Sequence, residues 1–150
     1  MSDPELSPEE VREALPSTGD LMYLVGQSWW RCAHAARAGR WELAAYFARR
    51  VRGIQRRLGI VRPKYRDDLD RFESERIAPV LAALERCDLT GFERAFAEAT
   101  DDANGKHAKW GKSYLHWVLP PDPPPDLDLS GGPGTGDAAL GGDHDRGRTV

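Results

Sequence analysis

The sequence contains only two cysteines, Cys32 and Cys87, which are too few and too far apart for a disulfide framework or a CxxC motif. No run of apolar residues approaches the roughly 20 residues that a helix needs to cross a bilayer. The first ten residues are acidic and lack the apolar core of a signal peptide. We therefore expect a cytoplasmic protein with reduced thiols and no membrane partner.

The motifs of the common catalytic and metal-binding classes are also missing. The chain has no glycine-rich phosphate loop, no recognisable Ser/His/Asp arrangement and no zinc-type spacing of cysteine and histidine. No glutamate lies three positions before His34, His107 or His116, so the Glu-x-x-His pairs of di-iron bundles are absent. These absences predict no metal site, and they leave open whether the protein is an enzyme.

The chain does contain enough apolar residues to build one domain. They make up 40% of its 150 residues and are concentrated in its central part, so we expect one folded unit over residues 17–119. Residues 1–16 are expected to form an N-terminal arm with a short helix near 8–14. Residues 120–150 are rich in proline and glycine and poor in apolar side chains, and we expect this tail to be disordered.

Apolar periodicity predicts an all-α fold, namely an antiparallel four-helix bundle, because apolar residues recur at spacings of three and four. The predicted helices span residues 20–38, 40–58, 64–87 and 89–109. Ser17 and Asp88 are suited to cap the first and the last of them. Pro79 should kink or split the third helix, since proline lacks an N–H and clashes with the preceding turn. Residues 111–119 should follow as an extended segment that packs over the bundle.

The last predicted helix has one face of special interest, on which a histidine follows two alanines. Ala99 and Ala103 leave room in front of His107, and an imidazole can ligate a metal or move a proton near neutral pH. A ligand pocket is one interpretation of this face, with His107 as the candidate catalytic group. The other is a core histidine whose ring N–H is satisfied by a neighbour. The candidate pocket residues are Trp29, Trp41, Ala99, Ala103, Lys106, His107 and Trp110.

A strongly basic stretch runs through the second predicted helix and its exit, with no acidic residue between Leu43 and Asp67. Its positive residues are Arg49, Arg50, Arg52, Arg56, Arg57, Arg62, Lys64 and Arg66. One interpretation is a solvated face that the following acids neutralise. The other is a binding face for an anionic partner, for which the candidate residues are Arg49, Arg52, Arg56 and Arg57. Sequence-specific DNA binding is not expected, because no recognition-helix motif is present.

Three stretches, Trp41–Tyr46, Ile77–Phe96 and Thr100–His107, resemble in order and spacing a group of small bacterial cytochrome c-like four-helix-bundle proteins. The resemblance covers roughly residues 19–118. In that group the last helix carries a CxxCH haem-attachment motif, followed by an extended apolar segment. At the matching position this chain has Ala103-Asn-Gly-Lys-His107, so both thioether-forming cysteines are missing. The resemblance therefore implies a degenerate haem motif and no covalent haem, whereas a non-covalent haem or a metal stays possible.

Two functions follow as hypotheses. The favoured one is a haem-less bundle that acts as a binding or accessory protein for an anionic or protein partner through the basic helix. The alternative is a site near His107 that binds a small molecule, a metal or a non-covalent haem, with His107 as ligand or general base.

Overall fold

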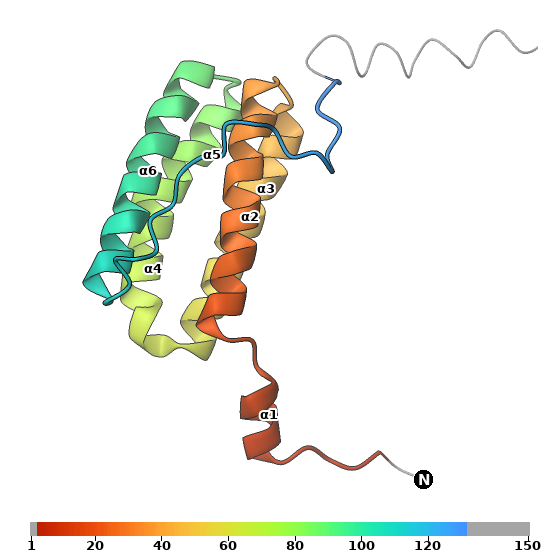
Figure 1. Ribbon diagram of the computed structural model, residues 1–150, viewed down its shortest axis with the longest axis vertical. Coiled ribbons are helices and arrows are strands. Elements are labelled where there is room, and N and C mark those ends of the chain that lie inside the picture. Colours follow the sequence, from red (N-terminus) through yellow and green to blue (C-terminus); the bar gives the residue numbers. More distant parts are fainter. Residues whose placement is uncertain (1–2, 132–150) are drawn as a thin grey trace, which may run out of the picture.

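The computed structural model describes residues 3–131 of the chain, and every regular element in that range is helical (Figure 1). The elements are α1 (Pro8–Ala14), α2 (Thr18–Arg37), α3 (Trp41–Val61), the short 3₁₀ turn η1 (Pro63–Tyr65), α4 (Arg66–Phe72), the π-helical turn η2 (Glu73–Ile77), α5 (Ala78–Glu85) and α6 (Leu89–Lys109). The prediction of an all-α fold is confirmed. Among the described residues, no helix is long and apolar enough to cross a membrane.

Local capping determines where several helices begin. Ser7 and Ser17 each form a capping box, in which Glu10 and Asp20 respectively return a side-chain bond to the cap backbone. Asp88 caps α6 through its side chain. Each cap satisfies backbone N–H groups that a helix start would otherwise leave without partners. These three starts agree with the sequence-based predictions.

The third predicted helix is interrupted, but one turn earlier than Pro79. The π-helical turn η2 occupies Glu73–Ile77, and the N–H of Ala78 donates to the carbonyl of Glu73, five residues back. Pro79 then lies in the first turn of α5, where its missing N–H needs no helical partner. The wider turn thus accommodates the proline, and α4, η2 and α5 continue as one interrupted rod (Figure 1).

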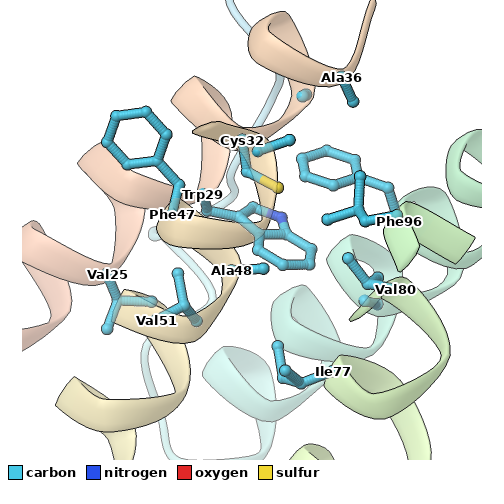
Figure 2. Packing of buried hydrophobic residues seen from close by; sticks show 14 of the residues in the cluster. Val25, Trp29, Cys32, Ala36, Phe47, Ala48, Val51, Ile77, Val80 and Phe96 are labelled. Atoms are coloured by element: carbon cyan, nitrogen blue, oxygen red, sulfur yellow. The ribbon is translucent and has the colours of Figure 1, made fainter. Parts of the chain in front are cut away.

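The core lies where α2 and α3 meet η2, α5 and α6. Figure 2 shows side chains from these elements converging, with the ring of Trp29 at the centre. The fully or almost fully buried residues include Val25, Cys32, Ala48, Val51, Ile54, Ile77, Val80 and Phe92. Burial of apolar side chains supplies the main driving force for folding, so this layer holds the helices in place around the site described below.

Residues 112–131, which we call the strap, leave α6 and run over the helices without regular structure (Figure 1). Asn104 of α6 holds the strap at Trp117, since its amide Nδ2 donates to the Trp117 carbonyl (3.0 Å) and its Oδ1 accepts from the Trp117 N–H (2.7 Å). Further along, the buried His34 of α2 donates from Nε2 to the carbonyl of Pro120 (2.9 Å). The expected extended segment is therefore present and longer than predicted.

The tail boundary differs from the prediction. Arg31 of α2 forms an ion pair with Asp126 (3.1 Å), and Pro124 is buried. Residues 120–131 thus belong to the packed strap, because their carbonyl and carboxylate groups find partners on α2 that composition alone does not reveal. The remainder of the predicted tail, 132–150, lies outside the described residues.

Candidate functional site

A cavity of about 350 Å³ lies between the start of α2, the second half of α3, α4, the last turns of α6 and the strap. Residues from the start of α2 and the end of α6 line it, and these two helix ends lie at the same end of the helical assembly (Figure 1). Its apolar lining includes Met22, Leu58, Leu69, Phe72, Ala103, Leu115 and Trp117. Cavities of a few hundred Å³ with mainly apolar walls and a few polar groups are typical of small-molecule sites.

Gln55 places a carboxamide in the wall of this cavity. It lies four residues after Val51 on α3, so it points into the helical assembly and is only 7% exposed. Its Oε1 atom is buried and has no hydrogen-bond partner among the described residues. A buried polar atom without a partner costs about 1–3 kcal/mol of stability. Such an atom is uncommon in native proteins, and it belongs to a residue of the cavity lining.

His107 also lines the cavity, and its two ring nitrogens differ. Nδ1 lies 3.0 Å from the carbonyl oxygen of Leu115, and because a carbonyl can only accept, Nδ1 carries the hydrogen in this contact. The ring packs edge-on against Trp117, with centroids 5.1 Å apart. Burial lowers the pKa of His107; the hydrogen bond to Leu115 opposes this effect, and the positive Lys112 nearby adds to the lowering. The neutral ring therefore keeps a lone pair on Nε2, which can accept a hydrogen bond or ligate a metal.

We call the partly exposed side of the cavity that Tyr65, Asp68 and Trp110 line its mouth. Tyr65 and Trp110 meet edge-on with centroids 4.8 Å apart. Asp68 accepts from the Lys109 ammonium (2.8 Å) and from the Trp110 indole N–H (2.8 Å). These two bonds hold the pKa of Asp68 below its usual range, and the bond from Lys109 has the larger effect. The pair joins α4 to the end of α6 and fixes the Trp110 ring at the mouth.

The structure brings four of the seven predicted pocket residues to the cavity: Ala103, Lys106, His107 and Trp110. The other three do not line it. Trp29 stacks on Phe96 (centroids 4.3 Å apart) and donates to Thr100 (2.9 Å), so it is a core residue. Ala99 is fully buried. Trp41 begins α3, 14 positions before the cavity residue Gln55, which corresponds to about 21 Å along a helix.

Sequence reasoning missed several residues of the site. Gln55 could have been found from the sequence, because it is a polar residue at an inward position of an otherwise apolar helix face. Buried polar groups normally have hydrogen-bond partners, so such a residue indicates a polar contact. Tyr65 and Asp68 come from η1 and α4, and Lys112 and Trp117 come from the strap. Their meeting depends on how the chain folds back, which periodicity does not encode.

The basic stretch is only partly neutralised. Arg56 forms a bidentate pair with Glu73 (2.6 and 2.9 Å). Arg49, Arg52 and Arg57 form no ion pair within residues 3–131, and Arg49 and Arg57 are exposed. The interpretation in which the following acids neutralise the whole face thus holds for one arginine of the four candidates.

Comparison with known proteins gives no further constraint on this site. Within the described range, no group of three or more His, Cys, Asp or Glu residues could hold a metal ion. No family model matches the chain, and no curated protein or solved structure was found to be similar to it.

Proposed function

We propose that this protein binds a small, largely apolar organic molecule in the cavity between α2, α3, α4, α6 and the strap. The observation that carries the proposal is the cavity itself, whose mainly apolar lining includes the buried Gln55. Burial of the apolar body of a ligand against these walls would supply the affinity, and the carboxamide of Gln55 is a polar group of the lining.

His107 offers the ligand a second polar contact. Its Nδ1 is held by Leu115, and its neutral ring leaves Nε2 as an acceptor. A neutral imidazole with one nitrogen held by a backbone carbonyl is suited to orienting a bound donor or to taking its proton. The proposed activity is ligand binding. If the protein is an enzyme, His107 would act as the base that takes a proton from the bound ligand.

A neutral fluorescent naphthylamine, N-phenyl-naphthylamine, tests the proposal directly, because its emission rises when it leaves water. The parent protein should bind it with saturation. Ala103→Phe fills the cavity and should weaken binding about tenfold or more, whereas Ala97→Phe adds the same ring at an exposed position of α6 and should not. Equal binding by both variants would show that the probe sits elsewhere.

A non-covalent haem is the alternative ligand of the same cavity. The fit rests on His107, whose Nδ1 is held by Leu115 in the manner of many metal-ligating histidines. Its Nε2 would be the iron ligand. Titration of the protein with haemin should then give a saturable Soret band that His107→Ala removes and Ala97→Phe keeps. A band that survives in His107→Ala would exclude this role.

A second candidate function is the binding of an anionic partner along the outer face of α3. Arg49, Arg52 and Arg57 lack ion-pair partners within the described part of the chain, whereas Arg56 has Glu73. Clustered guanidinium groups without counter-charges favour a polyanion. Retention on heparin at low salt, reduced by added salt, is the expected result. If the protein passes through a heparin column at low salt, the arginine face of α3 is a solvated surface and not a binding site.

For the architecture and lineage, we infer an antiparallel four-helix bundle whose members are α2, α3, the α4–α5 rod and α6. The short connections over residues 38–40 and 86–88 support this arrangement, because such turns join antiparallel neighbours. The similarity to cytochrome c-like bundles stays a hypothesis. In support of it, the segment that matches the haem motif, Ala103–His107, contributes three residues to the cavity wall.

A further inference from the structure

Two lysines flank the aromatic ring of Tyr65 at the mouth of the cavity. The ammonium nitrogen of Lys64 lies 5.0 Å from the ring centroid, and that of Lys112 lies 6.0 Å from it. Tyr65 and Lys112 both line the cavity. The ring of Tyr65 therefore has two positive charges within cation–π range.

The acidic side chain that lines the cavity is already engaged. Asp68 is the acidic residue of the cavity lining, and its carboxylate accepts from Lys109 and Trp110. Lys106 has a counter-charge in Asp102, at 3.6 Å. Lys64 and Lys112 form no ion pair with any residue of the described part of the chain. The mouth thus keeps two ammonium groups whose counter-ion is not supplied by residues 3–131.

We infer that the ligand is an amphipathic organic anion, with an apolar body in the cavity and a carboxylate or similar monoanionic head beside Tyr65, where Lys64 and Lys112 attract it. This inference rests on the proposed binding function and narrows its ligand class. The two lysines attract the head as mobile point charges, and the apolar walls exclude a ligand that is charged along its whole length. Gln55 then serves a polar group on the body, away from the head.

A matched pair of probes separates this inference from the proposed function. N-phenyl-naphthylamine is neutral, and anilinonaphthalene sulfonate is the same ring system with one sulfonate. Lys64→Gln/Lys112→Gln should weaken the sulfonate about 2- to 30-fold and leave the neutral probe within about twofold. Arg86→Gln/Arg94→Gln removes the same charge from the turn after α5 and from the first half of α6, and should change neither probe. Far-UV circular dichroism verifies that each variant is folded.

Each outcome of the titrations decides the matter. The inference is supported if the double lysine variant binds the sulfonate probe selectively more weakly and Ala103→Phe weakens the binding of both probes. If both probes bind the cavity but the lysine variant leaves the sulfonate unchanged, the anionic head is wrong and the apolar site stands. If the arginine control weakens the sulfonate equally, only general charge is involved and the inference fails. If neither probe binds the parent, the proposed function and the inference fail together.

Discussion

Replacing Gln55 with leucine should stabilise the ligand-free protein. In the parent, Oε1 of Gln55 is buried without a partner, and the side chain is only 7% exposed. Leucine has a similar volume, no hydrogen-bonding atoms and the branched apolar shape that its neighbours Leu58 and Phe72 can contact in the cavity wall. The substitution therefore removes the cost of an unsatisfied group and adds apolar burial.

The expected gain follows from those two contributions. An unsatisfied buried acceptor costs about 1–3 kcal/mol relative to the hydrated amide of the unfolded chain, and the substitution removes this cost. We expect the free energy of unfolding to rise by about 1–2 kcal/mol. For a domain of this size the melting temperature should rise by about 2–8 °C per kcal/mol.

Urea denaturation followed by circular dichroism measures this change, with Gln27→Leu as the matched control. Gln27 accepts from Arg31 at 2.6 Å, so its replacement should lower the free energy of unfolding by about 0.5–1.5 kcal/mol. The two glutamines should thus give effects of opposite sign. A Gln55→Leu variant that is less stable than the parent would show that the Gln55 amide has a partner in solution, and the reasoning that links this residue to a ligand would not hold.

Three further predictions concern thiols, pH and the arginine face. Burial raises the pKa of Cys32 to about 12, whereas Cys87 is exposed. A chromogenic disulfide reagent should therefore titrate one thiol in the folded protein and two in denaturant. Two thiols that react fast in the folded protein would contradict the burial of Cys32. Burial lowers the pKa of His107, so the unfolded chain takes up a proton before the folded one as the pH falls, and the free energy of unfolding should decrease below about pH 6.5. Urea denaturation across pH should show a weaker decrease of the free energy of unfolding in His107→Gln than in the parent. The same pH dependence in both proteins would refute the contribution of His107. Charge reversal at Arg52 should weaken heparin retention more than reversal at Arg56, which Glu73 already engages. The dependence of heparin binding on salt should have a slope lower by about one in the Arg52 variant. Equal losses in the two variants would indicate that the ion pair of Arg56 with Glu73 opens.

The helices and their starts could be predicted because they depend on neighbours in the sequence. Ser17 and Asp88 cap as expected, since a cap bonds within three residues. The interruption before Pro79 was expected for the right reason but placed too late. The sequence spacing of five between Phe72 and Ile77, both buried, fits a π-helical turn better than the three or four of an α-helix.

The cavity could be predicted only in part, because its walls come from distant segments. His107, Lys106 and Trp110 share one helix, so their grouping was visible as periodicity. Trp29 was assigned to the pocket by residue type, but its partner Phe96 lies on another helix and the two rings stack in the core. The lysines at Tyr65 could not be paired from sequence, since η1 and the strap are brought together only by the fold.

The path of the strap determines how this protein is best attached to a surface or to a fusion partner. Arg40, at the turn between α2 and α3, donates to the carbonyl of Asp128 (3.2 Å), whereas Thr18 and Gly19, at the other end of α2, line the cavity. A helix of 20 residues separates these points by about 30 Å. A tag joined after residue 131 would therefore leave the mouth of the cavity facing solution. A bulky partner joined directly before Thr18 would stand beside the mouth and obstruct the titrations proposed above.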